Sequence, residues 1–584
     1  MMKTGSVSAL GAALALAVST ASHAGVHRVP ADFGSIAAAL SAASAGDTVK
    51  VAAGTYFEHV TLKDGVELRG GYDGSYADPS NPSFNVTQIS GSGIGAAITA
   101  SGMSSATIVD GFKLSGGGGS PGAGVIVTGG APVFTNNDIS GNRQAGIAGG
   151  VYIAGGSAAR FESNDVRNNS SQGSGGGFHV ENSTPLLLSN LIEANVAPGS
   201  GGGVYLFKSA AVCSLNVFRD NRAGNGGGGA VRVQYTTGAR IVGSEIRNCV
   251  AAFGGGIFVK DASTVTVTDC DFIDCRADWS GASSDTTTHH GGGIAVAPFC
   301  SMIATDCGFE RCEAVGSTAR GGAIYGRQST VSLTGAGDPT SMPDAYILDC
   351  SSDYQGGGVW LDACSGTFAR IAMDNCSAAG RGGAMYVAMS VSSALDIDQN
   401  LITGCSADDG GAILLTSTVS PGRATNIRNN TIFGCSASSA TKAGGIGHYG
   451  PATTPPSKLA VIAGNIIANT MVGSCASCAT RSKPIINCTT IFQDPSNSAA
   501  ALFNADCISA FGGDSSNSTG DPRFCGPGLY TLQSCSPAAG TAGAGCPNAL
   551  PSLPDRGAST GSACACLLVS IEEESWGRIK ARYR

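Results

Sequence analysis

Hydrophobic and polar residues alternate within short segments that return along most of the chain. In each segment a glycine run leads into an apolar residue, an intervening residue and a second apolar residue, as in Gly-Gly-Gly-Val-Trp-Leu at 356–361. The phrase occurs eleven times between residues 149 and 446, and its first apolar residues are 26 to 37 positions apart. Period-2 alternation predicts β-strands, and its return at a longer step predicts a repeat architecture.

A second phrase precedes each glycine run and ends in a fixed type of residue. Examples are Asn-Asp-Ile-Ser-Gly-Asn at 137–142 and Ile-Ala-Met-Asp-Asn-Cys at 371–376. Inward asparagines at a turn can satisfy backbone groups of the neighbouring coil, and cysteines can fill the same slot as small apolar residues. We therefore expect a structural ladder of Asn142, Asn169, Asn195, Asn221, Cys249, Cys275, Cys312, Cys350, Cys376, Cys405 and Cys435.

Together these regularities predict a parallel β-solenoid with one coil per repeat. Every strand then pairs in register with its copy in the next coil, about 4.8 Å away, and equivalent side chains form columns. Eleven such coils would make a rod on the order of 50 Å long. The prediction requires Val204, Ile257 and Val359 to share one interior column.

Both ends of the repeat region resemble a known family. The sequence VPADFGSIAAALSAASAGDTVKVAAGTYFEHVTLKDGVELRGGYDGSY at 29–76 resembles the opening segment of secreted right-handed parallel β-helix proteins with the pectin-lyase-like fold, and DPRFCGPGLYTLQSCSPAAGTAGAG, from 521, resembles their closing coil. The resemblance implies an all-β fold, a right-handed parallel β-helix with a short N-terminal capping helix over Gly34 to Ala45. The GGA[IM] and FxxN phrases are also similar to repeats of polymorphic outer-membrane proteins.

The chain divides into five predicted parts. Residues 1–24 are typical of a secretory signal peptide, with Lys3, an apolar run and the small-residue site Ser22-His23-Ala24. We expect an N-terminal cap and first coils over 25–135, a regular β-helix over 136–470, a Cys-rich closing segment over 471–560 and a tail over 561–584. No later segment has about 20 unbroken apolar residues, so we expect a secreted or cell-surface protein without a membrane span.

Composition excludes several classes of protein. Glycine makes up 87 of the 584 residues but does not recur at every third position, which excludes collagen. A hydrophobic content of 42% with a net charge of -8 disfavours disorder. The mildly acidic balance, without a basic stripe in the repeat region, argues against nucleic acid as a partner.

An aromatic column follows the first apolar residue of the repeated phrase. Alternation should point this column outward, where flat rings could stack against a polysaccharide. The alternative is that stacked rings only stabilise the β-surface, by about 0.2–1 kcal/mol per neighbour contact. The candidate carbohydrate-stacking residues are Tyr152, Tyr205, Phe258, Tyr325, Trp360 and Tyr386.

The 21 cysteines fall into two groups. We expect those in the repeats to be buried thiols, because parallel side chains one coil apart hold their Cβ atoms wider than a disulfide prefers. A zinc site at Cys270, Cys275, Cys307 and Cys312 is the alternative, but it would need a sharp turn to bring four ligands together. We expect disulfides in the C-terminal group, from Cys475 onward. No cofactor is indicated, and calcium bound by loop carboxylates stays an open alternative.

Asp408, Asp409 and His448 are the candidate catalytic residues. Polygalacturonases of this fold carry paired aspartates, Gly-His-Gly and Arg-Ile-Lys, and this chain has Asp408-Asp409, Gly447-His448-Tyr449 and Arg-Ile-Lys at 578–580. Counted from Ile413 and Ile446, however, Asp409 and His448 differ by six positions along the strand direction, on the order of 15–20 Å. The second glycine is replaced by tyrosine, and Arg-Ile-Lys lies in the tail. The catalytic residues therefore stay unassigned.

We expect a β-helix protein that contacts polysaccharides or cell-surface glycans without catalysing a reaction, in the manner of an adhesin. A polysaccharide lyase or glycoside hydrolase is the competing class. A purely structural surface rod is the third. No motif assigns an oligomeric state.

Overall fold

A computed structural model gives the structure of the chain. It describes residues 24–119, 121, 124–144, 146–278, 290–337, 339, 343–390, 393–417, 425–438, 442–449, 460–463 and 465–468, and the backbone of five further strands C-terminal to these. The predicted signal peptide, most of the Cys-rich closing segment and the tail lie outside the described residues.

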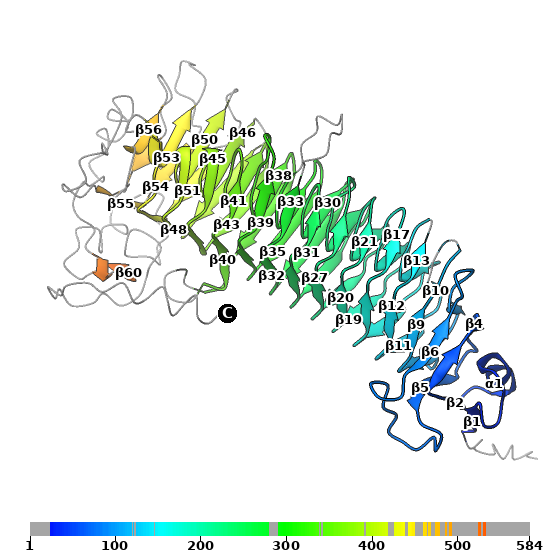
Figure 1. The fold of residues 1–584 in the computed structure, drawn as a ribbon. Coiled ribbons are helices and arrows are strands. Elements are labelled where there is room, and N and C mark those ends of the chain that lie inside the picture. The colour runs from blue at the N-terminus through cyan, green and yellow to red at the C-terminus, as the bar shows by residue number, and fades with distance from the viewer. Residues whose placement is uncertain are drawn as a thin grey trace, which may run out of the picture.

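The helix among the described residues, α1 (Ile36–Ala42), lies at the N-terminal end of a long stack of strands (Figure 1). The side chain of Ser35 accepts a hydrogen bond from the Ala38 amide at 3.1 Å and caps its first turn. Ile36, Ala39 and Leu40 are buried, so one face of the helix closes the apolar end of the stack. The helix is shorter than the expected 34–45 because Ser35 and Ala43 are extended.

Four parallel sheets, which we call A to D, form the walls of the stack (Figure 1). Each regular coil passes from sheet C to A, then B, then D. The strands of sheet C are β4 (Val60–Thr61), β7 (Ile98–Ser101), β10 (Val125–Thr128), β14 (Val151–Ala154), β18 (Phe178–Glu181), β22 (Val204–Phe207), β26 (Val231–Gln234), β30 (Ile257–Lys260), β34 (Ile294–Val296), β38 (Ile324–Arg327), β42 (Val359–Asp362), β46 (Met385–Met389), β50 (Ile413–Ser417), β53 (Ala443–Tyr449) and β56 (Ser474–Cys478).

Sheet A follows sheet C in each coil. Its strands are β1 (Val26–Val29), β2 (Thr48–Ala52), β5 (Glu67–Tyr72), β8 (Ile108–Asp110), β11 (Val133–Thr135), β15 (Arg160–Glu162), β19 (Leu186–Leu188), β23 (Val212–Ser214), β27 (Ala239–Val242), β31 (Thr264–Thr268), β35 (Ser301–Thr305), β39 (Thr330–Thr334), β43 (Ser365–Ala369), β47 (Ala394–Asp398), β51 (Thr425–Arg428), β54 (Ala460–Ala463) and β57 (Ile485–Asn487).

Sheet B comes next. Its strands are β3 (Gly54–Tyr56), β6 (Thr87–Ser90), β9 (Lys113–Ser115), β12 (Asp138–Ser140), β16 (Asp165–Arg167), β20 (Leu191–Glu193), β24 (Val217–Arg219), β28 (Glu245–Arg247), β32 (Asp271–Ile273), β36 (Gly308–Glu310), β40 (Ala345–Leu348), β44 (Ile371–Asp374), β48 (Leu401–Thr403), β52 (Thr431–Phe433), β55 (Ile466–Ala468) and β58 (Thr490–Phe492).

Sheet D is made of short strands that precede the glycine runs. They are β13 (Arg143–Gln144), β17 (Ser170–Ser171), β21 (Val196–Ala197), β25 (Arg222–Ala223), β29 (Val250–Ala251), β33 (Arg276–Asp278), β37 (Glu313–Val315), β41 (Ser351–Ser352), β45 (Ser377–Arg381) and β49 (Ser406–Asp409). Beyond the four sheets, β59 (Phe524–Gly526) and β60 (Leu529–Leu532) form an antiparallel pair.

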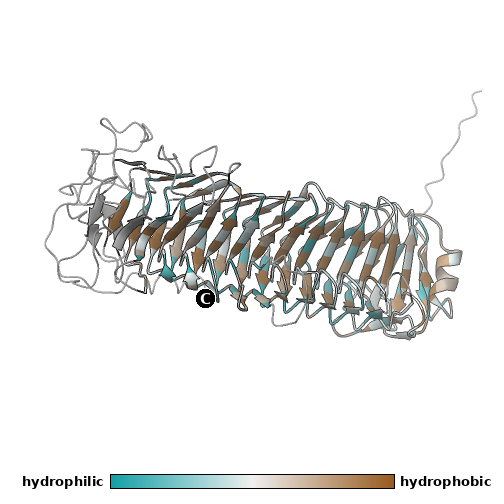
Figure 2. Cartoon of the chain, turned by 90° about the horizontal axis from the view of Figure 1, so that it is seen from above, coloured by the Kyte–Doolittle hydropathy of each residue, from teal (hydrophilic) through white to brown (hydrophobic). Residues whose placement is uncertain are grey.

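The predicted register is confirmed. Val204 and Val359 belong to one interior column, whose strands pair in the order Val204, Val231, Ile257, Ile294, Ile324 and Val359. All six side chains are fully buried. Figure 2 shows hydrophobic residues recurring in the strands along the length of the rod. The core is therefore a continuous apolar column, to which each coil adds one layer.

Candidate functional site

The aromatic column of sheet C stacks as its register predicted. Tyr325, Trp360 and Tyr386 pair on successive coils, and the ring centroids of Tyr325 and Trp360 are 4.8 Å apart at an interplanar angle of 8°. The rings of Trp360 and Tyr386 are 6.1 Å apart and nearly parallel. Where the column has arginine, the cation lies over a ring instead, as the Arg232 guanidinium does over Phe258 at 4.4 Å.

The expectation that these rings form an exposed stripe is wrong. Five of the six candidate stacking residues are at most 9% exposed, namely Tyr205, Phe258, Tyr325, Trp360 and Tyr386. The turn from sheet D to sheet C folds back over them, and Trp360 Nε1 donates to Gln355 Oε1 at 3.2 Å. A Cβ on Gly356, whose φ is +67°, would lie 2.8 Å from that of Trp360. The rings therefore pack between the sheet and its own preceding turn.

Tyr152 is the member of the candidate set that stays partly exposed. Its hydroxyl donates to Glu181 Oε2 at 3.1 Å on the next coil. Loss of surrounding water and the Glu181 carboxylate raise the pKa of Tyr152 to about 12. Near neutral pH the Tyr152 hydroxyl therefore keeps its proton and remains the donor in this hydrogen bond.

The predicted ladder residues occupy one turn between sheets B and D. Asn195 shows the asparagine pattern: its Nδ2 donates to Val166 O at 2.8 Å, and its Oδ1 accepts from the amide of Asn169 at 3.1 Å. Cys376 repeats the first of these contacts, because its thiol donates to Ile347 O at 3.4 Å. The described cysteines are free, buried thiols, and burial raises the pKa of Cys249 to about 12.

Two further ladders were missed by the sequence analysis. One lies between sheets A and B and contains Asn137, Asn164, Asn190 and Asn216. Another lies between sheets C and A. It begins at the Ser157 amide, and the hydroxyls of Ser183, Ser209, Thr236 and Ser263 each accept from the amide of the ladder residue on the preceding coil. The first asparagine of the phrase at 137–142 was a signal for the asparagine ladder. The hydroxyl ladder gave little signal, because its serines and threonine do not belong to a fixed motif.

The structure does not bring the candidate catalytic residues into one site. Asp408 is half-buried and forms an ion pair with Lys442 at 2.6 Å, and this partner lowers the pKa of Asp408. Asp409 is buried and accepts from the amide of Ala443 at 3.0 Å. His448 pairs with Leu415 in a second interior column of sheet C, two residues further along the strands, and is 1% exposed; burial lowers its pKa to about 4. His448 thus faces the core rather than an open groove.

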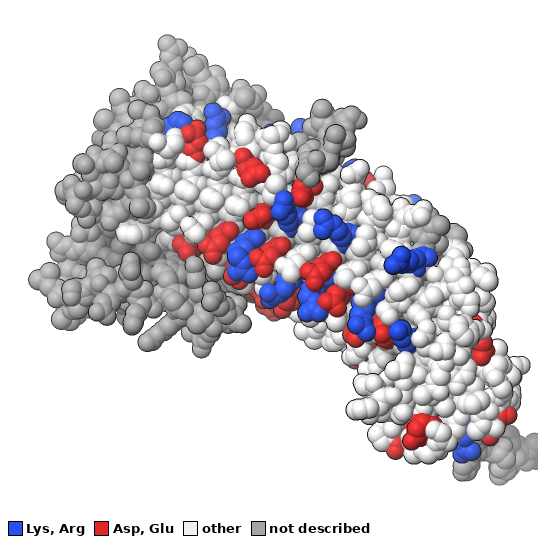
Figure 3. All heavy atoms as spheres, viewed as in Figure 1, with Lys and Arg blue, Asp and Glu red and all other residues white. Residues whose placement is uncertain are grey.

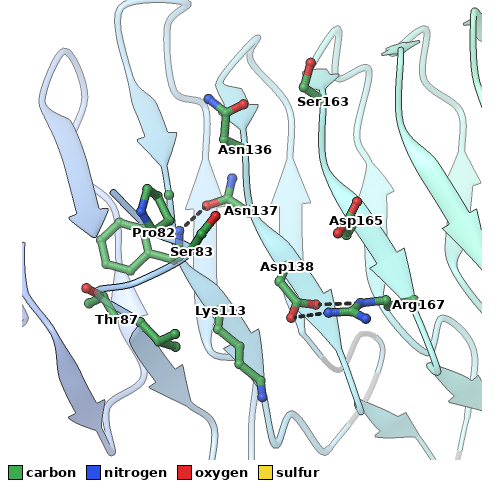
Figure 4. A pocket seen from close by; sticks show the side chains of 13 residues that line it. Pro82, Ser83, Thr87, Lys113, Asn136, Asn137, Asp138, Ser163, Asp165 and Arg167 are labelled. Carbon is green, nitrogen blue, oxygen red and sulfur yellow. Dashed lines mark hydrogen bonds and ion pairs between the residues drawn. The ribbon is translucent and has the colours of Figure 1, made fainter. Parts of the chain in front are cut away.

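A polar groove lies near the N-terminal end of the rod, on the outer face of sheet B (Figure 4). Its volume is about 580 Å³. Lys113, Asp138 and Asp165 form its floor, because they pair on successive strands β9, β12 and β16 and point outward. Asn136 and Ser163 stand at its rim in left-handed turns, with φ of 54° and 55°.

The loop between β5 and β6 makes the facing wall of the groove. The Asn81 amide donates to Gly71 O at 2.7 Å and fixes the loop against sheet A. Pro82 lies so close to Gly71 and Gly111 that a Cβ on either glycine would be under 3 Å from the proline ring. Two glycines therefore let the loop approach the sheet and shape the groove.

Charge in the groove is partly compensated. Arg167 donates to both carboxylate oxygens of Asp138, at 2.9 and 3.4 Å, as the two dashed lines in Figure 4 show. Asp165 is exposed, but partial loss of surrounding water raises its pKa; the Arg167 guanidinium opposes this rise, and the neighbouring charges of Asp138 and Glu193 add to it. The site thus offers a cation, an ion pair and a carboxyl that protonates more readily than usual.

Sequence reasoning missed this groove. The phrases at 137–142 and 164–169 both carry aspartate at their second position, so the signal was present. The wall, however, comes from a loop outside the repeats, and no periodicity predicts where such a loop folds.

Paired charges continue along the outer surface beyond the groove. Arg219 Nε donates to Glu193 Oε1 at 2.7 Å, and Arg247 Nε donates to Glu245 Oε1 at 2.7 Å, both on sheet B. Figure 3 shows acidic and basic side chains next to one another along the middle of the rod. Exposed pairs of this kind contribute about 0–1 kcal/mol each.

Comparison with known proteins supports the fold. The family described as "Right handed beta helix region" matches residues 53–215 and 149–337, which together span residues 53–337 of the rod. The chain folds as a right-handed parallel β-helix. The match fits the stacked parallel strands described above. No curated protein sequence matches the chain.

Two solved structures have a distant likeness to this β-helix protein. One is a polygalacturonase from Erwinia carotovora ssp. carotovora, with 10% identity, 82% of this chain and 96% of that chain covered, and a TM-score of 0.17. The other is the PL6 family alginate lyase AlyGC, with 9% identity, 85% and 99% coverage, and a TM-score of 0.25. Sequence identities and TM-scores this low do not indicate an activity or a substrate for this chain. The likeness to polymorphic outer-membrane repeats stays a prediction.

The described part of the chain contains neither a metal-binding cluster nor a membrane-spanning helix. No three His, Cys, Asp or Glu side chains within it gather to hold a metal ion. None of its helical segments has the length and apolar character needed to cross a bilayer.

Proposed function

We propose that this β-helix is a secreted or surface-displayed protein that contacts polysaccharides without catalysing a reaction, and that the groove on sheet B is its contact site. The open polar groove across three successive coils carries the proposal. Its amide, carboxylate and guanidinium groups are planar and can form paired hydrogen bonds with neighbouring sugar hydroxyls. The signal-like sequence at residues 1–24 supports export.

The groove suits a chain-like ligand because it opens on the side of a rod. A polysaccharide lying across the coils would meet Lys113, the Asp138–Arg167 pair and Asp165 in turn. Since Asp138 and Arg167 already hold each other in place, little side-chain entropy remains to be lost on binding. Preorganised groups of this kind favour binding.

Arg167→Gln tests the proposal, with Arg219→Gln as its matched control. Both arginines pair with a carboxylate on the outer face of sheet B, but only Arg167 lines the groove. We expect Arg167→Gln to weaken retention on an immobilised panel of uronic-acid polysaccharides about tenfold, the loss of one charged hydrogen bond. Arg219→Gln should bind like the unaltered protein. Equal losses in both variants, or no retention of the unaltered protein, would reject the proposal.

Glycoside hydrolysis is the second candidate, and the raised pKa of Asp165 favours it. A carboxyl that protonates readily beside a second carboxylate, here Asp138, is the pairing that glycoside hydrolysis uses. The same polysaccharide panel should be assayed for new reducing ends and for unsaturated ends, the products of hydrolysis and of lyase action. Product formation that falls at least a hundredfold in Asp165→Asn would replace the binding proposal with catalysis.

A further inference from the structure

A second hollow lies where sheet C turns into sheet A, in the middle of the rod. Its volume is about 780 Å³. Thr264, Ser301, Thr330 and Ser365 line it from four successive strands of sheet A, where they pair in register as one outward column. A strip of hydroxyl groups therefore crosses four coils beside the turn.

Phe299 stands at the edge of this hollow and is 81% exposed. It occupies the third position of a four-residue turn that is closed by the bond from the Cys300 amide to Ala297 O at 3.3 Å. Pro298 precedes it, and the φ of Phe299 is +63°. A left-handed residue after proline in such a turn is ordinarily glycine, because a side chain there is strained.

The position of Phe299 therefore costs free energy through its backbone, and its exposed ring gains almost no burial to offset that cost. Tyr76 differs from Phe299: its φ is +58°, but its ring is buried beside Tyr72. Phe299 has no comparable burial. Strained and exposed aromatic residues that persist in this way point to a role in binding.

The ring is held on a rigid support. The Phe299 amide donates to Gln328 O at 2.8 Å on the next coil. Cys300, which follows Phe299, lies opposite Ser263, the last hydroxyl of the ladder between sheets C and A. Tyr235 occupies the equivalent turn two coils away, with φ of 50° and 54% of its surface exposed. At about 4.8 Å per coil the two turns are about 10 Å apart, a spacing that matches alternate rather than adjacent sugar rings of one chain-like ligand.

The chemistry of the lining indicates an uncharged ligand. Besides the hydroxyls, the described lining contains the Gln328 amide, Ala363 and the thiol of Cys300. Burial raises the pKa of Cys300, so the thiol is neutral. No lining side chain carries a charge that would attract an acidic sugar or a phosphate.

The geometry points to a second binding site in this hollow, for a neutral sugar residue of a polysaccharide. Phe299 stacks on the apolar face of the pyranose ring, while Gln328, Ser301 and Thr330 bond its hydroxyls. Apolar stacking combined with a few fixed polar groups is the usual composition of a small-ligand site. The inference extends polysaccharide contact to a separate site, and it stands even where the sheet B groove binds nothing.

Phe299→Gly is the decisive variant because glycine suits the left-handed turn. We expect its unfolding midpoint in urea to equal or exceed that of the unaltered protein, while its retention on immobilised dextran, mannan, galactomannan or β-glucan falls at least tenfold. Leu215→Gly is the matched control, since Leu215 is also left-handed and exposed but lies away from the hollow. It should keep full retention. Ser301→Ala with Thr330→Ala should also weaken retention.

The arms of the experiment separate this site from the groove. Arg167→Gln should leave retention on neutral polysaccharides unchanged if the hollow is the site. Loss in Arg167→Gln with full retention in Phe299→Gly would overturn the inference in favour of the groove. Unchanged binding in Phe299→Gly, or no retention of the unaltered protein on any neutral polysaccharide, would overturn it outright. So would a shift from dimer to monomer in Phe299→Gly, which would assign the ring to self-association.

Discussion

At the scale of single residues, one turn position accepts two different side chains. Asn195 both donates to the coil below and accepts from an adjacent amide, whereas Cys376 supplies a single weak donor. The thiol is nevertheless compatible with the slot because it is small and easily buried. From Cys249 onward, cysteine replaces asparagine at this turn position, so the ladder has weaker hydrogen bonds and a more apolar interior.

A buried histidine makes the C-terminal coils sensitive to acid. The pKa of His448 is about 4 in the folded protein, because burial disfavours its charged form, against about 6.5 when unfolded. The unfolded chain therefore binds more protons between these values. Stability is complete above about pH 6.5 and falls as the pH is lowered toward 4, by up to about 3 kcal/mol.

Hydrogen exchange of the β50 and β53 amides at pH 7.5 and 4.5 measures this effect. His448→Leu is the comparison variant, since Leu415 lies next to His448 in the same interior column and leucine fits there. We expect the exchange protection of these strands to fall at low pH in the unaltered protein and to change much less in His448→Leu. Parallel behaviour of the two proteins would show that other groups cause the acid sensitivity.

At the scale of elements, the glycine runs let the turn from sheet D pass over the first outward side chain of sheet C. Gly356→Ala should therefore cost more than backbone strain alone. A Cβ there would be 2.5 Å from Val359 O, whereas a Cβ on Gly434, at nearly the same φ, would meet nothing within 4 Å. We expect Gly434→Ala to lower stability by about 1–2 kcal/mol and Gly356→Ala to lower it by clearly more, measured by urea unfolding. Equal losses would mean that the turn moves away freely.

The same turn explains which features the sequence could predict. Register and the facing of side chains follow from period-2 alternation, so the column through Val204 and Val359 was predictable. The exposure of the aromatic column was not predictable. It depends on whether the turn from sheet D folds over Trp360, and this is a tertiary contact that the alternation of residues does not encode. The groove was missed for a similar reason, since the wall at Pro82 comes from outside the repeats.

At the scale of the whole molecule, each coil contacts mainly its two neighbours. In the three ladders and in the interior column, each residue pairs with the equivalent residue of the adjacent coil. Stability in such an array is close to a sum of coil and interface contributions. The rod should therefore tolerate loss of a whole coil better than loss of half a coil.

Deletion of residues 217–244 tests this additivity. The cut removes one full coil, β24 to β27, and joins Asn216 to Glu245, which begins the equivalent strand of the next coil. Glu193 then lies beside Arg247 and keeps an oppositely charged neighbour. We expect a cooperatively folded protein with unchanged β-sheet circular dichroism and a rod about 4.8 Å shorter by small-angle scattering. Deletion of 217–230 removes half a coil and connects a strand of sheet A directly to one of sheet C, so it should aggregate or unfold. If the full-coil deletion fails in the same way, the coils depend on contacts beyond their neighbours, and the stability of the rod is not additive.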